Sequence, residues 1–502
     1  MNAVVIGSGF GGLAAAVRLR ARGYRVTVLE ALDRPGGRAR VIEQDGFTFD
    51  AGPTVITAPQ LLHELFELVG RNSRDYFELM PVDPFYRIRF DDGSTFDYVG
   101  DEGRLLAQIE KLNLADVDNY RRLAEHARRI FDVGYTQLAD RPFHELGTMV
   151  GVIPSMMKLK SYRTVSGLVR HYIEDERLRQ ALTFEPLLVG GNPFSTTSIY
   201  LLIHWLERKW GVHFAKGGTG AIVDGLVRLL AELGVDVRLS SPVDEIVVRD
   251  GRVVGVRTEG GSLVPADVVV SNADPSWVYR HMIPDGQAPR GRRKAGRMRQ
   301  SMSLFVGYFG TDRVYDDLAH HTILLGPRYR GLLEDIFRRK VLADDFSLYL
   351  HAPARTDPGM APPGGDAFYV LSPVPNNRSG VDWSTEAEPY FDRILEALER
   401  RAMPGLKDHI VTRSVMTPTD FETTLRSVDG AAFGPEPVLT QSAWFRYHNR
   451  APDIDGLFFV GAGVHPGAGV PGVLSSAKVL ERVLADPTDP VPVPRPPRSV
   501  AV

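Results

Sequence analysis

Ala3-Val4-Val5-Ile6-Gly7-Ser8-Gly9-Phe10-Gly11-Gly12 is the stretch that decides the fold. Its first half predicts a short buried strand, and the residues from Leu13 to Arg22 have the apolar spacing of a helix. A second strand is predicted from Tyr24 to Leu29, and it ends at the acidic residue Glu30. A G-x-G-x-x-G turn between a strand and a helix, followed by such an acid, is typical of domains that bind a dinucleotide. We therefore predict an α/β chain that begins with a Rossmann-like domain.

Each glycine of this turn has a separate expected task. Gly7 permits the tight turn, Gly9 lets the backbone approach a pyrophosphate, and Gly12 lets the helix pack closely on the strand. The start of the helix offers free N–H groups and a positive dipole end to the phosphates. Glu30 is placed to accept hydrogen bonds from a ribose, which argues against a 2′-phosphate there. The turn alone leaves open whether the dinucleotide is NAD or FAD.

Length and composition exclude several classes of protein. The chain has 502 residues, enough for two or three domains, and its 59 basic and 62 acidic residues give a net charge of −3. This balance favours no nucleic-acid partner. Cysteine is absent, which excludes disulfides, thiolate catalysis, iron–sulfur clusters and zinc–cysteine sites, and we expect no metal ligands. The first strand begins at Ala3, and we found no apolar run of membrane-spanning length, so we expect a cytoplasmic enzyme that is soluble or bound to a surface.

Two further glycine blocks extend the expected cofactor site. In Arg34-Pro35-Gly36-Gly37-Arg38, the glycine pair lets a loop run close to a ligand, and Arg38 supplies donors suited to a pyrophosphate. Phe47 to Asp50 predicts a strand, after which Gly52, Pro53 and Thr54 turn the chain toward the expected cofactor.

The last block comes from the other end of the chain. Residues 456–472 predict a strand, a loop that contains Gly461 and Gly463, and a helix from about Pro471 to Leu484. We expect Gly461, Gly463, Val470 and Pro471 to contact the cofactor. Two glycine-rich helix starts from opposite ends of one chain favour one long ligand between them. FAD fits this arrangement better than NAD, with the early turn at the pyrophosphate and the late one at the flavin ring.

The chain leaves its cofactor domain and returns to it. Strands are predicted at 234–237, 243–248, 253–257 and 267–270 as one small sheet, and we expect Val243 and Asn272 to contact the cofactor. The apolar strands at 304–309, 346–350 and 368–371 suit the walls of an apolar pocket, or an ordinary buried sheet. We predict cofactor-domain parts at 1–80, 211–300 and 436–485, a helical region at 81–210, a substrate domain at 301–435 and a flexible proline-rich tail at 486–502.

Residues 148–170 combine apolar bulk with flanking cations. Apolar side chains recur from Met149 to Leu159, with Lys158, Lys160 and Arg163 among or after them. A helix lying in the plane of a membrane surface has this composition, and a buried helical pair would look similar. Pro154 is expected to interrupt any single helix here.

These blocks together resemble the bacterial phytoene desaturases of carotenoid synthesis. The resemblance rests on residues 7–12 with 34–38, 46–57, 187–200, 210–221, 326–330, 437–446 and 456–476. It implies an FAD-containing flavoprotein with an amine-oxidase-like fold, an inserted mixed-sheet substrate domain and a membrane-contacting helical region. It also implies a peripheral position on the inner face of the cell membrane, with quinone or oxygen as electron acceptor. The implied reaction is stepwise desaturation of 15-cis-phytoene to neurosporene or lycopene, by hydride transfer to FAD and loss of a neighbouring proton.

The catalytic residues are the weakest part of this resemblance. The acid and arginine associated with the region after Pro142-Phe143 in the family do not map cleanly, because residues 144–148 read His-Glu-Leu-Gly-Thr. The candidates are His144, Glu145, Arg328 and His465. Three other functions stay open: another carotenoid desaturase or isomerase acting on a C30 or hydroxylated substrate, a flavin amine oxidase, and a non-catalytic prenyl-lipid escort.

Overall fold

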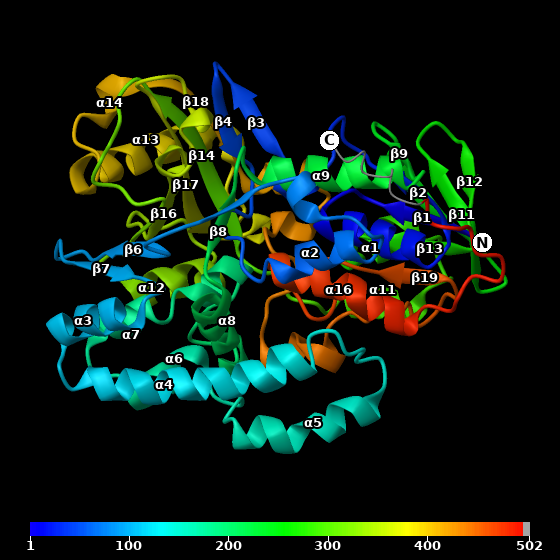
Figure 1. The fold of residues 1–502 in the computed structure, drawn as a ribbon, viewed down its shortest axis with the longest axis horizontal. Helices are drawn as coiled ribbons and strands as arrows, with labels where there is room; N and C mark the ends of the chain where they lie inside the picture. The colour runs from blue at the N-terminus through cyan, green and yellow to red at the C-terminus, as the bar shows by residue number, and fades with distance from the viewer. Residues whose placement is uncertain (495–502) are drawn as a thin grey trace, which may run out of the picture.

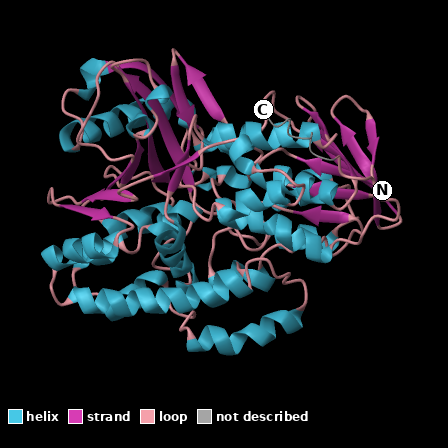
Figure 2. Cartoon of the chain, viewed as in Figure 1, coloured by secondary structure: helices cyan, strands magenta, loops and turns pink. Residues whose placement is uncertain are grey.

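A computed structural model describes residues 1–494. The chain forms two sheet-containing regions side by side, with a layer of helices along one edge of both (Figure 1). Figure 2 shows strands gathered at the two sides of the view and long helices below them.

The dinucleotide-binding sheet has five parallel strands. Their order is β19 (Leu457–Phe459), β13 (Val268–Ser271), β1 (Asn2–Ile6), β2 (Arg25–Leu29) and β9 (Asp236–Arg238). Helix α1 (Phe10–Ala21) follows the glycine turn and packs against α16 (Val470–Val483) and α9 (Thr219–Glu232). The α/β, Rossmann-like fold class predicted from residues 3–30 is therefore confirmed.

Two predicted strands join a different sheet from the one expected. The small antiparallel sheet consists of β10 (Val243–Arg249), β11 (Arg252–Thr258) and β12 (Leu263–Pro265). Strand β13 pairs instead with β1 and β19, and β9 pairs with β2. All four residues of β13 are buried, as is typical of a central parallel strand, but an apolar run by itself does not indicate its partners.

The larger sheet is mixed and has seven strands. Their order is β18 (Ile410–Met416), β14 (Ser303–Thr311), β17 (Asp366–Val374), β16 (Leu348–His351), β15 (His321–Leu324), β6 (Tyr86–Arg89) and β7 (Thr95–Tyr98). Only β15 and β6 run parallel among these pairs of the described chain. Side chains alternate along β14: Phe305 and Phe309 pack toward α13 (Trp383–Arg401), and Leu304 and Val306 face the other way. This alternation leaves one face of the sheet free to form a wall.

Six helices form the layer below the sheets. They are α3 (Glu102–Leu112), α4 (Asp116–Phe131), α5 (Leu146–Lys158), α6 (Val165–Tyr172), α7 (Glu176–Ala181) and α8 (Leu202–Trp210). Helix α5 continues through Pro154, so the predicted interruption is wrong. A proline in a helix leaves the carbonyl four residues earlier without its partner, and here that residue, Val150, is 56% exposed to solvent.

Shorter elements complete the chain. They are α2 (Gln60–Glu67), α10 (Pro275–Trp277), α11 (Pro289–Ala295), α12 (Tyr329–Glu334), α14 (Leu406–His409) and α15 (Pro418–Thr423), with the antiparallel pairs β3 (Val41–Gln44) with β4 (Phe47–Asp50) and β5 (Leu79–Pro81) with β8 (His213–Ala215).

The described part of the proline-rich C-terminal segment lies on the first domain. Arg20 donates to the carbonyl oxygen of Val491 at 2.9 Å, and the N–H of Val491 donates to the carbonyl oxygen of Gly23 at 2.8 Å. Arg22 pairs with Asp486 at 2.5 Å. Arg20 and Arg22, in α1 and at its cap, thus contact the described part of this segment. The flexibility of the tail at 486–502 stays a prediction, and residues 495–502 lie outside the described residues.

Candidate cofactor and substrate site

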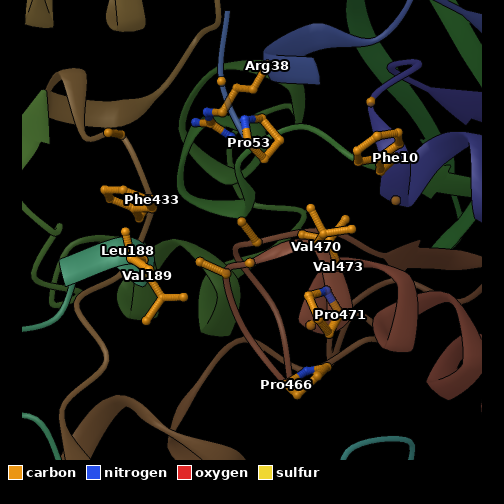
Figure 3. A pocket seen from close by; sticks show the side chains of 18 of the residues that line it. Phe10, Arg38, Pro53, Leu188, Val189, Phe433, Pro466, Val470, Pro471 and Val473 are labelled. Carbon is orange, nitrogen blue, oxygen red and sulfur yellow. The ribbon is translucent and has the colours of Figure 1, made fainter. Parts of the chain in front are cut away.

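One cavity of about 560 Å³ runs from the glycine turn of β1 to the free face of the large sheet. Its lining comes from segments far apart in the chain, among them Phe10, Arg38, Leu188, Phe433 and Val470 (Figure 3). The predicted cofactor residues that line it are Gly7, Gly9, Glu30, Gly37, Arg38, Gly52, Pro53, Thr54, Val243, Asn272, Val470 and Pro471. The two ends of the sequence thus meet at one site.

The glycine turn leaves no room for side chains. A Cβ on Gly9 would lie 2.8 Å from the side-chain amide nitrogen Nδ2 of Asn272, and one on Gly52 would lie 2.2 Å from the backbone carbonyl oxygen of Arg38. Gly7 has a φ of +89°, a conformation that only glycine adopts without strain. The backbone itself therefore forms the wall at this end, as a close-fitting pyrophosphate requires.

Three glycines expected at the cofactor do not line the cavity. A Cβ on Gly12 would lie 2.0 Å from the carbonyl oxygen of Gly7, so this glycine lets α1 pack on the turn. Gly461 lies against the Asn272 side chain, and a Cβ on Gly463 would lie 2.3 Å from Cδ of Pro275. These positions shape the backbone behind the site, and Gly11 lines the cavity in their place.

Glu30 connects the second strand to the glycine turn. Its carboxylate accepts hydrogen bonds from the backbone N–H and the hydroxyl of Ser8 at 2.7 and 2.6 Å, and from the N–H of Leu32 at 2.9 Å. The side chain is buried and lines the cavity at the end of β2. The predicted ribose acceptor therefore also holds the turn in its shape.

Arg38 presents an unpaired donor to the cavity. The preceding residues Gly36 and Gly37 have φ values of +105° and +56°, and the Arg38 guanidinium donates to the Ser427 hydroxyl at 2.5 Å. Its buried Nε has no hydrogen-bond partner among residues 1–494. Burial lowers the pKa of Arg38, and the nearby Asp274 carboxylate opposes that shift. A buried cation with a free donor fits a phosphate ligand.

Two helix starts face the same cavity. Gly9, Phe10 and Gly11 line it at the start of α1, and Gly469 and Val470 line it at the start of α16. Gly469 precedes α16 with a φ of +92°. Together with the glycine-shaped cradle and Arg38, this arrangement fits FAD, with the pyrophosphate near α1 and the flavin toward α16.

Of the four candidate catalytic residues, three lie away from the cavity and one lines it. Glu145 and His144 lie on the surface before α5 and face each other at 3.7 Å, and Arg328 is half exposed and pairs with Asp335 and Asp345. None of these three lines the cavity, although all lie in the described chain. His465 does line it.

The His465 ring is held in one place. Its Nε2 lies 3.0 Å from the carbonyl oxygen of Leu138, and its ring centroid lies 4.7 Å from that of Phe143. Burial lowers the pKa of His465 to about 4, so the ring is neutral near pH 7. Because a carbonyl oxygen can only accept, the proton resides on Nε2 and the Nδ1 lone pair is free.

The substrate end of the cavity is apolar. Strands of the large sheet contribute Leu304, Val306, Ile323, Leu348 and Leu371, and Met302 and Leu325 lie directly beside these strands. Helix α8 contributes Leu202, Ile203 and Leu206, and the 3-10 turn Glu185–Val189 contributes Leu187 and Leu188. The strands predicted at 304–309, 346–350 and 368–371 therefore form both a sheet core and a pocket wall. Phe433 adds an aromatic ring to this wall (Figure 3).

One acidic cluster beside this wall escaped the sequence analysis. Glu207 lines the cavity and accepts a hydrogen bond from the Tyr86 hydroxyl at 2.7 Å, and Glu185 lies 3.2 Å from Nδ1 of His204. Burial raises the pKa of Glu185 to about 8 and that of Glu207 well above its ordinary value, and it lowers the pKa of His204 to about 3. The cluster is therefore uncharged near pH 7.

A weak signal for this cluster exists in the sequence. Glu207 follows Ile203 by four residues and precedes Trp210 by three, so it lies on the apolar face of its helix. A second buried group, the histidines His320, His321 and His351, lacks even this signal, because two strands bring it together.

Comparison with known proteins identifies the family and the fold of this chain. Residues 10–479 match the family model described as flavin containing amine oxidoreductase. The chain is 51% identical over 487 residues to the lycopene-forming phytoene desaturase of Pseudescherichia vulneris, covering 96% of this chain and 99% of that protein. It is 44% identical to the neurosporene-forming phytoene desaturase of Rhodobacter capsulatus, with 97% and 95% covered. The solved structure of putrescine oxidase bound to putrescine has a TM-score of 0.66 at 15% identity, covering 96% and 98%, which shows a shared fold.

Proposed function

Because the chain belongs to the bacterial phytoene desaturases, within the flavin-containing amine oxidoreductase family, we propose that it desaturates 15-cis-phytoene stepwise to neurosporene or lycopene. The protein is an FAD-dependent oxidoreductase. The observation that carries the substrate assignment is the continuous cavity, which leads from the dinucleotide cradle to a wall of apolar side chains. Its apolar lining suits a hydrocarbon that must lie against the flavin.

The chain supplies position and exclusion of water. Gly9, Glu30 and Arg38 would hold the dinucleotide, and Val470 and Pro471 would lie beside the flavin. When bound, FAD supplies the acceptor for a hydride from the allylic carbon. Leu304, Val306 and Leu348 line the cavity, where they would hold the hydrocarbon chain in line and keep water out.

The proton that leaves the neighbouring carbon needs only a weak acceptor. The positive charge between the two losses is allylic and delocalised, so a strong base is not required. His465 is the candidate acceptor, because its ring is neutral, lines the cavity and has a free lone pair on Nδ1. Glu207 is a poorer candidate near pH 7, because burial keeps it protonated.

The lining argues against an amine substrate. An ammonium group in a buried site needs an ionised carboxylate or a cage of aromatic faces. At the substrate end, burial keeps the carboxyl group of Glu207 neutral, and the Asp50 carboxylate is already engaged by Thr219 and His351. The surrounding wall is mainly aliphatic. The amine-oxidase fold is therefore combined with a site of different polarity.

Helix α5 supports contact with a membrane surface. Met149, Val152 and Met156 line the cavity from one side of this helix. Leu146, Val150, Ile153 and Met157 recur at i, i+4, i+7 and i+11, and each is 46–58% exposed. A helix that is apolar on both sides, between a cavity and the exterior, suits a lipid substrate that enters from a membrane.

Attachment to the inner face of the cell membrane follows as a proposal. Lys158, Lys160 and Arg163 at the end of α5 would face anionic headgroups. Among residues 1–494, no helix is long and apolar enough to cross a bilayer. We further propose a membrane quinone or oxygen as the final electron acceptor, since a quinone shares the phase of the substrate.

Activity is tested with the purified chain, FAD and liposomes that carry 15-cis-phytoene, with a quinone or oxygen supplied separately. We expect coloured polyenes, resolved by chromatography, with neurosporene or lycopene as the last product. Parallel liposomes carry the C30 analogue 4,4′-diapophytoene. If only the C30 substrate is converted, it replaces phytoene in the proposal. If FAD-loaded protein converts neither substrate, with a quinone or with oxygen, the proposed function is refuted.

Membrane contact is tested by liposome flotation. Val150→Glu and Met157→Glu together add charge to the exposed side of α5, and we expect loss of binding to anionic vesicles. The matched control is Val411→Glu on β18, where the valine is equally exposed at 54%. Unchanged flotation of the α5 double variant would reject this surface.

A further inference from the structure

Three buried histidines meet behind the cavity wall. His321 begins β15 and stands opposite His351, the last residue of β16, and His320 comes directly before β15. The ring centroids of His320 and His321 are 4.4 Å apart, those of His320 and His351 are 4.8 Å apart, and those of His321 and His351 are 5.4 Å apart. The exposed fractions are 5%, 0% and 0%.

Each ring has one nitrogen engaged by an outer partner. Nδ1 of His320 lies 2.6 Å from the Thr356 hydroxyl, and Nδ1 of His321 lies 2.7 Å from the Tyr349 hydroxyl. Nε2 of His351 lies 3.4 Å from a carboxylate oxygen of Asp50. Hydroxyl and carboxylate partners of this kind orient histidine rings that bind a metal.

The other nitrogen of each ring is buried without a partner. Nε2 of His320, Nε2 of His321 and Nδ1 of His351 make no hydrogen bond to any residue from 1 to 494. The buried histidine His126 behaves differently, because Tyr172 and the carbonyl of Leu159 engage both of its ring nitrogens. Three unpaired nitrogens in one buried cluster are costly unless something binds them.

We propose that His320, His321 and His351 bind a divalent transition-metal ion, with zinc as the fitting ion. One nitrogen of each ring lies within 4.8 Å of one nitrogen of both others, so a modest closure brings all three to a common centre. Zinc takes imidazole nitrogen at about 2.0–2.1 Å and is commonly held by three histidines and one further ligand. Calcium and magnesium prefer oxygen ligands and do not fit three imidazoles.

The surroundings suit a cation. Asp50, buried beside His351, also accepts from the N–H and the hydroxyl of Thr219 at 2.6 and 2.8 Å. Because it contacts His351, its carboxylate would offset part of the charge of a metal ion that this histidine binds.

The proposed ion would brace the floor of the substrate cavity. The Tyr349 hydroxyl, bonded to His321, also lies 2.9 Å from that of Thr54, which in turn lies 2.6 Å from the Tyr369 hydroxyl. Thr54, Tyr349, Tyr369 and Asp50 all line the cavity. The ion would thus hold β15, β16 and the end of β4 together, whatever the substrate is.

Metal content is the primary test. The full chain is purified without a polyhistidine tag or chelator, and its zinc is measured by mass spectrometry. We expect about one zinc per chain, lost in His320→Ala and His351→Ala and retained in the control His126→Ala. Zinc that is retained in both cluster variants would place the ion elsewhere and overturn the proposal.

A second measurement uses wild-type protein and so does not depend on folded variants. The chain is stripped with a chelator and titrated with Co²⁺. We expect visible absorption typical of four-coordinate cobalt with nitrogen ligands, competition by Zn²⁺, and a higher unfolding temperature with either ion. A stripped chain that shows neither the cobalt absorption nor the rise in unfolding temperature would overturn the proposal. The same holds for a chain that is purified without a bound transition metal and then fails to take up cobalt.

Discussion

At the dinucleotide end of the cavity the wall is mostly backbone, whereas at the substrate end it is mostly side chain. Gly9 and Gly52 leave no space for a Cβ, and their neighbours are fixed by turns and helix starts. At the other end, Leu304 and Val306 of β14 and Leu348 of β16 line the cavity with their side chains. The first end tolerates almost no change in covalent structure, and the second can change volume and polarity one side chain at a time. A shared fold can therefore keep its cofactor and accept a different substrate.

The largest effect is expected from a single methyl group directly behind the cradle. In Gly12→Ala the new Cβ would lie 2.0 Å from the carbonyl oxygen of Gly7, a backbone atom that cannot move without opening the turn. We expect destabilisation of more than about 3 kcal/mol and loss of bound FAD, followed by thermal unfolding and flavin absorbance. Gly151→Ala is the control, since no described atom lies within 4 Å of its Cβ. Normal flavin content in Gly12→Ala would break the contrast between the two ends.

A smaller effect is expected when the acidic cluster is changed. Glu185 has an ordinary pKa of 4.5, which burial raises to about 8. Below pH 4.5 the group is protonated in both folded and unfolded chains; as the pH rises toward 8, the unfolded chain loses this proton first, so folding becomes less favourable. The free energy of unfolding should fall between pH 5 and pH 8 by an amount on the order of a few kcal/mol more in the wild type than in Glu185→Gln. The free energy of unfolding of both proteins is measured by chemical denaturation at several pH values in this range. If it changes with pH by the same amount in both, Glu185 is not held in its neutral form, contrary to our inference.

The smallest effect concerns the shape of the apolar wall. Val306→Phe fills part of the cavity without touching the cradle, so FAD content should stay normal while turnover of phytoene falls about tenfold. Val411→Phe, at an exposed position on β18, is the matched control. Equal loss of flavin and turnover in Val306→Phe would mean that the two ends are not independent.

The cradle was predictable because its chemistry is local. Gly7, Gly9 and Glu30 follow from one strand–turn–helix–strand pattern, and the turn at Gly469 to Pro471 follows from a second. The partners of β13 were not predictable, because a fully buried apolar strand fits the centre of any sheet. Gly12, Gly461 and Gly463 belong to the same patterns but act behind the surface, a distinction that only the packing reveals.

The substrate end was predictable in kind and not in detail. Apolar strands implied an apolar wall, but the choice of Leu304 and Val306 over Phe305 depends on which face α13 covers. His320 and His351 lie 31 residues apart in the chain, and the antiparallel register of β15 and β16 brings the three histidines together. Glu207 was overlooked because a glutamate in a helix is usually exposed.

The packing of α1 on α16 has a consequence for how the protein is made. The glycine turn is made long before two of its partners, because β1 lies between β2 and β13, and α1 packs on a helix that ends at Val483. Domains ordinarily fold as they emerge, amino terminus first. Here the sheet and the helix packing around the first forty residues are completed only by β13, β19 and α16. A chain that stops shortly before residue 470 would therefore lack one of the two helix starts that line the cavity.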